Sequence, residues 1–408
     1  ASYTSMLIFL PSPLAVNHIR TYDPAGYHPP CSTFGYRPAR GWIIIRPLCN
    51  NNQKRQRAEN RERETATMDY RLTEDQQAIK DLAERFTADE ITPHAAKWDE
   101  AHIFPRETIQ QAAELGFGAI YLPEADGGIG LGRIEAALII EAMAYGCPST
   151  SAFISIHNMA TWMIASFGDQ AVKDRYLPKL ITMEHIASYC LTEPGAGSDA
   201  ASLKTRAVLD GDHYVLNGSK AFISGGGENE IYVCMVRTGD PGHKGISCLV
   251  VEKDMPGVSF GAQEKKLGWH SQPTAMVNFE DVRVPVANRV GDEGQGFKIA
   301  MSGLDGGRLN IGACSLGGAQ RCLDEATRYV QERNQFGQAI AQFQNTQFML
   351  ADMATELAAA RALTYMAAQK VTENAADKTP FAAMAKLKAT EAGSRVANDA
   401  LQLHGGYG

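Results

Sequence analysis

The segment from Tyr189 to Asp199 has the residue types best suited to hold a ligand. It reads Tyr-Cys-Leu-Thr-Glu-Pro-Gly-Ala-Gly-Ser-Asp, so one proline and two glycines stand between the hydroxyls of Thr192 and Ser198. Such a stretch predicts an irregular backbone with outward amides, which suits a phosphate or an aromatic ring. An ordinary interdomain turn has the same composition, and glycine-rich loops are commoner than binding sites. Composition alone favours the turn.

Three further segments combine glycines with polar or charged residues. Asp305-Gly-Gly-Arg308 places helix-weakening glycines beside an arginine, which indicates either helix packing or room for a ligand. Arg333-Asn-Gln-Phe-Gly337 interrupts a helical run and is typical of a C-cap glycine with a basic residue beside it. The stretch from Gln402 to Gly408 reads as a C-cap or as a loop that exposes its backbone to a ligand. Each segment alone favours the structural reading.

Composition excludes several classes of protein. The chain has 408 residues, a formal charge of -7 and no cluster of Lys and Arg interleaved with aromatics, which argues against a nucleic-acid binder. No apolar stretch approaches the length of a membrane span. The eight cysteines are scattered without C-x-x-C spacing, so we predict no metal site. Neither a dinucleotide-binding fingerprint nor a P-loop occurs.

The first 67 residues differ from the rest of the chain. They hold seven of the 18 prolines, and they carry nine Lys and Arg against four Asp and Glu. A secretory signal is disfavoured because Pro11 and Pro13 interrupt the apolar stretch. The early arginines hint at an organellar transit peptide, but Gly, Pro and Tyr break any amphipathic helix. We expect translation to begin at Met68 and residues 1–67 to be a disordered extension outside any domain.

Hydrophobic periodicity then divides the chain into helical, β and helical blocks, which we place at residues 68–186, 187–292 and 293–408. Thr73 to Gln76 forms a capping box, and helices are expected at about 134–145 and 155–167. An Asp-Gly turn at 210–211 predicts a hairpin, followed by strands at 231–236, 246–252 and 275–279. The helical period returns from Gly296, with one apolar stripe at Leu350, Met353, Leu357 and Ala360. Thr379 and Pro380 are expected to be the N-cap and N1 residues of the last helix.

Taken together, these segments resemble the acyl-CoA dehydrogenase family, flavoenzymes that introduce a double bond between Cα and Cβ of an acyl-CoA. Residues 190–202 fit the first signature of the family, residues 402–408 fit the start of the second, and the similarity runs from about Leu72 to Gly408. The resemblance implies an α+β fold with an N-terminal helical domain, a middle β-sandwich or barrel domain and a C-terminal helical bundle. It also implies FAD as cofactor.

The resemblance also assigns roles to individual residues. The first signature would line the flavin, Phe222 to Ser224 would cover its other face with the Ser224 hydroxyl near N5, and the C-terminal segments would hold the ADP part in a neighbouring subunit. The residues so assigned to FAD are Tyr189, Cys190, Leu191, Thr192, Glu193, Pro194, Gly195, Ala196, Gly197, Ser198, Phe222, Ile223, Ser224, Arg333, Phe343, Gln344, Gln402, Leu403, His404, Gly405 and Gly406. Those assigned to the substrate are Ser198, Asp305, Gly306, Gly307 and Arg308, with Arg308 near CoA.

No catalytic base is assigned within the sequence. Removing the α proton beside a thioester needs a carboxylate, and in most of the family this is a glutamate just beyond the second signature. That position would follow Gly408, so the base is expected beyond it, and the chain as given is expected to be nearly inert. In two branches of the family a glutamate precedes the arginine of the substrate helix, but here Gly307 stands there. Glu193 belongs to the flavin framework.

Three segments, at 221–224, 266–274 and 303–310, resemble the branch of the family that acts on isobutyryl-CoA. Gly306 and Gly307 are expected to leave space for a short branched acyl group. The resemblance further implies valine degradation, electron transfer to electron-transferring flavoprotein and a homotetramer built as a dimer of dimers. The alternatives are a butyryl- or 2-methylbutyryl-CoA dehydrogenase, and a non-catalytic flavin- or acyl-CoA-binding protein. The expected compartment is the cytoplasm in a bacterium, which we prefer, or the mitochondrial matrix in a eukaryote.

Overall fold

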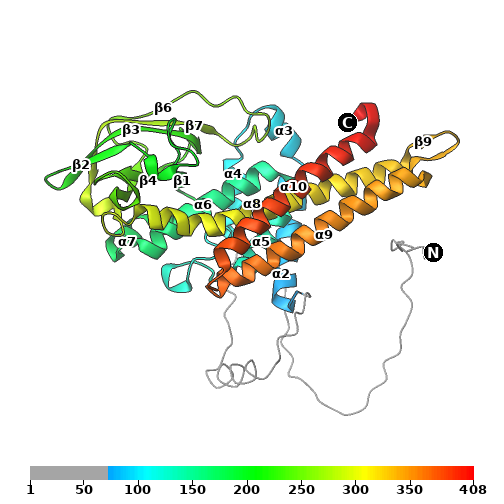
Figure 1. Ribbon diagram of the computed structural model, residues 1–408, viewed down its shortest axis with the longest axis horizontal. Helices are drawn as coiled ribbons and strands as arrows, with labels where there is room; N and C mark the ends of the chain where they lie inside the picture. The colour runs from blue at the N-terminus through cyan, green and yellow to red at the C-terminus, as the bar shows by residue number, and fades with distance from the viewer. Residues whose placement is uncertain (1–71) are drawn as a thin grey trace, which may run out of the picture. The chain divides into compact units, whose positions relative to one another are not determined.

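The computed structural model describes residues 72–408, and the predicted extension at residues 1–67 lies outside them. Helices come first along the chain, a β-sheet follows, and three long helices end it (Figure 1). The predicted α+β order is therefore confirmed. The helices before the sheet are α2 (Glu74–Phe86), α3 (Ala95–Glu100), α4 (Arg106–Glu114), α5 (Arg133–Gly146), α6 (Pro148–Phe167) and α7 (Gln170–Ile181), with a π-helical turn at Thr87–Ile91.

Helix α2 begins as the sequence predicts. The Thr73 hydroxyl accepts a hydrogen bond from the Gln76 amide, and the Gln76 side chain accepts one from the Thr73 amide, which completes the capping box. Helices α5 and α6 are buried over most of their surface, so they form the centre of the helical core. Helix α6 begins at Pro148 and not near Ser155. Proline suits the first position of a helix, because its fixed φ is already helical and its missing amide hydrogen is not needed there.

The middle of the chain forms one eight-stranded sheet with the strand order β6-β7-β3-β2-β4-β5-β8 and with β1 paired parallel to β4. Its strands are β1 (Ala187–Cys190), β2 (Arg206–Asp210), β3 (His213–Ser224), β4 (Ile231–Arg237), β5 (Ile246–Glu252), β6 (Val258–Phe260), β7 (Thr274–Pro285) and β8 (Arg289–Val290). The predicted Asp-Gly hairpin joins β2 to β3 in register, with Asp210 opposite His213.

Strand β4 shows why its sequence is apolar without interruption. Tyr232, Cys234 and Val236 face a core enclosed by the sheet itself, whereas Val233 and Met235 face α6 and α8. Both faces of the strand are therefore buried, and alternation with polar residues is lost. Strand β5 is buried in the same way, which explains why both strands could be located from the sequence.

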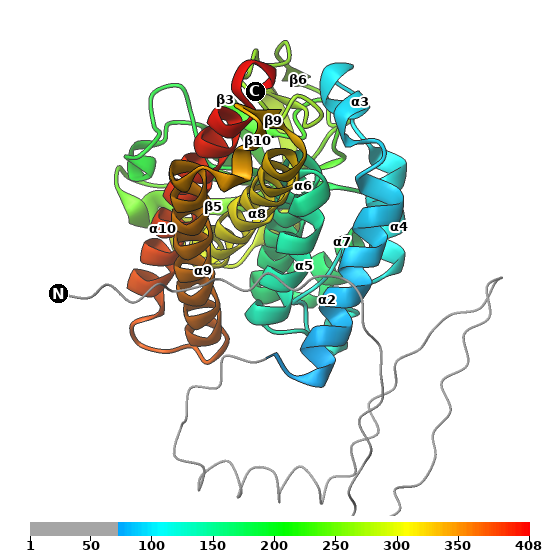
Figure 2. The ribbon, with the colours of Figure 1, turned by 90° about the vertical axis from the view of Figure 1, so that its right-hand side faces the viewer.

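The C-terminal block consists of α8 (Gly296–Glu332), α9 (Gln344–Thr372) and α10 (Lys378–His404), which lie side by side (Figure 2). Of the predicted stripe on α9, Met353, Leu357 and Ala360 are buried. The prediction for the start of α10 is wrong, because the helix begins at Lys378 and Thr379 lies inside its first turn. The Thr379 hydroxyl donates instead to Asp305 on α8, at 2.7 Å.

None of the helices among residues 72–408 is long and apolar enough to cross a membrane.

Candidate active site

The predicted flavin loop begins inside the sheet and leaves it at Leu191. Tyr189 and Cys190 belong to β1, and the Cys190 side chain is buried in the core that the sheet encloses, as is that of Ile223. Any contact that Cys190 or Ile223 makes with a cofactor is therefore through its backbone. Beyond Leu191 the amides and carbonyls of Glu193 and Ala196 pair in both directions at 3.1 Å, which closes a tight turn over Pro194 and Gly195.

Glu193 anchors this loop and does not face a substrate. Its carboxylate accepts hydrogen bonds from the amides of Lys204 and Thr205 at 2.6 and 2.9 Å, and it forms a buried ion pair with Lys220 at 2.7 Å. Burial raises the pKa of Glu193, but Lys220 and the donors from Thr205 and Lys204 outweigh it, so the pKa lies below its ordinary value. Glu193 is thus held as a carboxylate inside the framework of the loop.

The second predicted flavin segment, Phe222 to Ser224, is attached to the first. The Ala221 amide donates to the Thr192 carbonyl at 2.9 Å, and the Ser188 hydroxyl donates to the Ser224 carbonyl at 2.7 Å. Lys220 also donates to the Leu191 carbonyl at 3.1 Å. Two stretches predicted to flank one ring are therefore neighbours in the fold.

Phe222 has an unusual backbone conformation. The pairing of β3 with β7 is irregular between Lys220 and Ile223, and Phe222 lies there with a φ of 58° and with 66% of its surface exposed. A bulky residue in the left-handed region is strained, and such strain concentrates at binding sites. The bulge turns the ring out of the sheet, where it can stack on a planar ligand.

These features fit a flavin. The loop and the bulge present an exposed aromatic ring, and a Cβ on Gly195 or Gly197 would meet nothing within 4 Å, so the backbone there is open to close approach. The Tyr189 hydroxyl is buried without a hydrogen-bond partner among the described residues, and burial raises the pKa of Tyr189. A polar ligand at this place would supply the missing partner.

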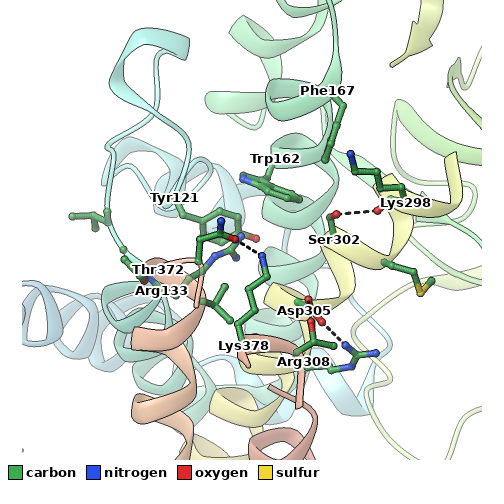
Figure 3. A pocket seen from close by; sticks show the side chains of 16 residues that line it. Tyr121, Arg133, Trp162, Phe167, Lys298, Ser302, Asp305, Arg308, Thr372 and Lys378 are labelled. Carbon is green, nitrogen blue, oxygen red and sulfur yellow. Dashed lines mark hydrogen bonds and ion pairs between the residues drawn. The ribbon is translucent and has the colours of Figure 1, made fainter. Parts of the chain in front are cut away.

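The predicted substrate segment lies on α8 beside a cavity of about 640 Å³ (Figure 3). Asp305 is 9% exposed, and both of its carboxylate oxygens are engaged, one by Arg308 at 2.5 Å and the other by the Thr379 hydroxyl. Four cationic residues and this one carboxylate line the cavity, together with aromatic side chains. The cationic residues are Arg133, Lys298, Arg308 and Lys378.

Gly306 does not face open space. A Cβ on Gly306 would lie 2.5 Å from Nη1 of Arg133, so the glycine admits the guanidinium against α8. Arg133 packs with its guanidinium 3.6 Å from the centre of the Tyr121 ring and 5.5 Å from that of Trp162. The room expected beside Gly306 for an acyl chain is therefore occupied by Arg133.

Gly307 does line a cavity. This smaller cavity of about 230 Å³ lies between α6 and α8. The atoms exposed in it are almost wholly apolar, because its polar residues contribute mainly their carbon atoms. A Cβ on Gly307 would lie 2.9 Å from Sδ of Met159. The lining residues are Ser155, Ile156, Met159, Leu304, Gly307, Arg308, Ile311 and Lys386. Arg308 lines both cavities, so it stands between the polar and the apolar space.

The residues predicted to hold the ADP part lie at the other end of α8. Gly296, its first residue, packs against Ser247 of β5, whereas Arg333 follows its last residue. Helix α8 has 37 residues and is about 55 Å long, so Arg333 lies about that far from Gly296 and from β5. Arg333 is exposed, Phe336 and Phe343 pack with ring centres 6.1 Å apart, and His404 stacks on Tyr329. The start of α9, which is Gln344, and the end of α10, which is His404, lie at the same end of the bundle as β9 (Asn334–Gln335) (Figure 1).

Sequence reasoning missed three residues that shape this site: Lys220, Arg133 and Gln272. Lys220 had a signal, because it shares the inward parity of Tyr214 and Leu216 in β3, and a lysine at such a position needs a buried partner. Arg133 and Gln272 had none, since their importance comes from long-range contacts. Among residues 72–408, no group of three or more His, Cys, Asp or Glu side chains could hold a metal ion.

Comparison with known proteins agrees with this geometry. Models of the N-terminal, middle and C-terminal domains of acyl-CoA dehydrogenase match residues 73–184, 188–282 and 294–408. The chain is 55% identical over 337 residues to the mitochondrial isobutyryl-CoA dehydrogenase of Bos taurus, which covers 83% of this chain and 81% of the relative.

Two solved structures are also similar. Butyryl-CoA dehydrogenase from Megasphaera elsdenii has a TM-score of 0.81 at 37% identity, covering 83% of this chain and 90% of that one. The FAD complex of PigA has a TM-score of 0.80 at 31% identity, covering 83% and 90%.

The fold and the site define an FAD-dependent oxidoreductase that acts on acyl-CoA thioesters. The chain belongs to the acyl-CoA dehydrogenase family.

Proposed function

We propose that this protein dehydrogenates a short branched acyl-CoA, isobutyryl-CoA above all, between Cα and Cβ to give the enoyl-CoA. The observation that carries the choice of substrate is the small apolar cavity beside Gly307. Its volume of about 230 Å³ suits a four-carbon branched acyl group. The relative from Bos taurus, named an isobutyryl-CoA dehydrogenase, supports the same choice.

The acyl group is proposed to enter this cavity between α6 and α8, and the CoA part to continue past Arg308. CoA carries phosphates, and the larger cavity beyond Arg308 has four cationic residues against one carboxylate. Because Asp305 is engaged on both oxygens, it orients Arg308 and the start of α10 and does not serve as a base. Ser198, exposed in the flavin loop, is proposed to reach the substrate or the pyrophosphate.

Bound FAD supplies the acceptor for the β hydrogen. The chain's own part is to hold the acyl group beside the ring and to exclude water from Cα and Cβ. The flavin is proposed to lie along the loop from Tyr189 to Ser198 and under Phe222 to Ser224. The proton at Cα needs a carboxylate, and the glutamate expected beyond Gly408 is proposed for this step. Within the described part of the chain, Glu193 and Asp305 are both already engaged.

The length of α8 supports an active site shared between subunits. Since Arg333 lies about 55 Å from the sheet end of this helix, the residues at the far end are proposed to hold the ADP part of FAD in a neighbouring subunit. These are Arg333, Phe343, Gln344 and residues 402–406. The assembly proposed is a homotetramer, a dimer of dimers.

Electrons are proposed to pass to electron-transferring flavoprotein during valine degradation. The relative from Bos taurus is named mitochondrial. For this chain the compartment is proposed to follow its source, the cytoplasm in a bacterium and the matrix in a eukaryote.

The test is a substrate profile of the full-length protein. Rates with isobutyryl-, 2-methylbutyryl- and butyryl-CoA would be measured with an artificial electron acceptor and compared as kcat/KM. The proposal predicts the largest value for isobutyryl-CoA. A larger value for butyryl- or 2-methylbutyryl-CoA would overturn the choice of substrate. Bound flavin with no turnover of any acyl-CoA would indicate a non-catalytic binding protein on this fold.

A further inference from the structure

Gln272 is a buried residue beside the predicted flavin segment, and its side-chain amide is only half paired. The side chain is 4% exposed, and its Nε2 donates to the Ser224 hydroxyl at 2.6 Å. Its Oε1 is buried and has no hydrogen-bond partner among the described residues. If the amide were turned over, its NH₂ group would lack the second partner instead, so one group stays unmet in either orientation.

Hydrogen bonds to several elements fix the backbone around Gln272, and this fixes the position of its side chain. The Gln272 amide donates to the Trp269 carbonyl at 3.1 Å, and its carbonyl accepts from Lys266. On either side of it, the Ser271 hydroxyl donates to Ser149 at 2.8 Å and the Pro273 carbonyl accepts from the Gly225 amide at 2.8 Å. Gln272 is thus fixed against both α6 and the end of β3.

This environment determines how Ser224 can act. Because the Ser224 oxygen accepts from Gln272, its own hydrogen is free to point away from that residue. Ser224 lies two residues after the exposed and strained Phe222, on the segment assigned to one face of the flavin. A buried acceptor and an oriented hydroxyl therefore lie side by side where the ring is expected.

We propose that Gln272 is a positioning residue of the flavin site, which aims the Ser224 hydroxyl at the ring and uses its own Oε1 to accept a hydrogen bond from an N–H or O–H group of bound FAD. The inference rests on the placement of FAD along Tyr189 to Ser198 and Phe222 to Ser224. It explains why a buried amide is left half paired in the protein alone, since a polar group without a partner is costly unless a ligand completes it.

The test replaces Gln272 with methionine, which has a similar volume and no hydrogen-bonding group. Apoprotein of the wild type and of Gln272→Met would be titrated with FAD, and the visible spectrum and reduction potential of the bound flavin would be recorded. We expect FAD affinity to fall about tenfold in Gln272→Met, with a displaced absorbance maximum and a changed potential. The melting temperature of the apoprotein should be unchanged or higher, because the unpaired oxygen is gone.

A matched control, Gln263, lies in the same segment between β6 and β7. Gln263 has both amide groups paired within the protein, with the Gly226 carbonyl at 3.0 Å and the Thr274 amide at 2.6 Å. Gln263→Met should lower the melting temperature of the apoprotein and leave the flavin spectrum and potential unchanged.

A second variant covers the case in which Gln272→Met does not fold. Ser224→Ala should displace the flavin spectrum in the same direction, and in the double variant the two effects should not add, because the residues act as one unit. The proposal is overturned if Gln272→Met, or Ser224→Ala where only that variant folds, keeps the affinity, spectrum and potential of the wild type. A wild-type protein that binds no FAD would instead overturn the placement of the cofactor itself.

Discussion

Nζ of Lys220 lies 2.7 Å from Oε1 of Glu193, and this buried ion pair joins the loop assigned to the flavin to the strand that covers it. Lys220 is fully buried and Glu193 is 7% exposed. The pair explains how an irregular, glycine-rich loop keeps one shape, and it removes Glu193 from the candidates for the catalytic base. The buried cation and carboxylate are each satisfied only by the other and by nearby backbone groups.

Replacing Lys220 by methionine should destabilise the protein by about 3–5 kcal/mol, because a buried carboxylate loses its ionic partner. Chemical unfolding of the variant would measure this loss. Adding Glu193→Gln to it should recover most of the stability, since no buried charge is then left alone. The exposed pair of Arg283 and Asp210 is the control, and Arg283→Met should cost less than about 1 kcal/mol. Equal losses for the buried and exposed pairs would contradict the role of Glu193.

Phe222→Gly should relieve the backbone strain at this position and at the same time weaken FAD binding. Glycine adopts a positive φ without strain, so the apoprotein should gain about 1 kcal/mol of stability. The affinity for FAD should fall about tenfold, because a stacking aromatic ring is lost. Phe222→Trp should keep the affinity. Asp281→Gly, at another positive φ in the same sheet, should leave FAD binding unchanged. Unaltered FAD affinity in Phe222→Gly would show that the ring does not touch the cofactor.

Gly306 and Gly312 lie on the same helix and should respond in opposite directions to alanine. In Gly306→Ala the new Cβ would meet Arg133 at 2.5 Å, so we expect a loss of about 1–3 kcal/mol. In Gly312→Ala the nearest atom lies at an ordinary 3.5 Å, so the higher helix propensity should add up to about 1 kcal/mol. Thermal unfolding of both variants gives the comparison. Stabilisation by Gly306→Ala would contradict the close packing of Arg133.

Gly307→Leu should fill the apolar cavity beside Met159, which lies 2.9 Å from the position of the new Cβ. We expect the affinity for isobutyryl-CoA to fall at least tenfold, measured by calorimetric titration, while FAD binding is retained. Met159→Ala enlarges the same cavity and should shift the preference toward 2-methylbutyryl-CoA. An isobutyryl preference that survives Gly307→Leu would place the acyl group elsewhere.

His157 should make the stability of the N-terminal block depend on pH. Burial lowers the pKa of His157 from 6.5 to about 4, and the ring is held neutral, donating to the Leu180 carbonyl and accepting from the Ala187 amide. The unfolded chain therefore binds the proton first as the pH falls. The contribution of His157 is fully present above pH 6.5 and decreases toward about pH 4, by about 3 kcal/mol in all. Unfolding free energies between pH 4.5 and 8 should show a weaker slope in His157→Gln.

The sequence predicts those elements whose pattern of apolar residues follows directly from which of their faces are buried. Strands β4 and β5 are predictable because both of their faces are buried, which gives continuous apolar runs. The sequence predicts too late a start for α6, because a proline such as Pro148 is typical both of a helix break and of a first helical residue. The prediction that Thr379 is a cap is wrong because its hydroxyl bonds to Asp305, 74 positions away, and not to its own helix.

In the candidate site, too, local motifs are predictable from the sequence and long-range contacts are not. The flavin loop and the bulge could be named from their motifs, but their attachment through Lys220 and Glu193 depends on residues 27 positions apart. The room beside Gly306 was predicted from the absence of a side chain, whereas the fold brings Arg133 from another helix to fill it. The half-paired amide of Gln272 depends on a contact with Ser224, 48 positions away, which no local pattern records.

The most direct measurement of the central claim is the visible spectrum of the full-length protein, before and after isobutyryl-CoA is added without oxygen. The account predicts flavin absorbance that bleaches with isobutyryl-CoA more readily than with butyryl-CoA. A protein without flavin absorbance, or a bound flavin that no acyl-CoA bleaches, would contradict it.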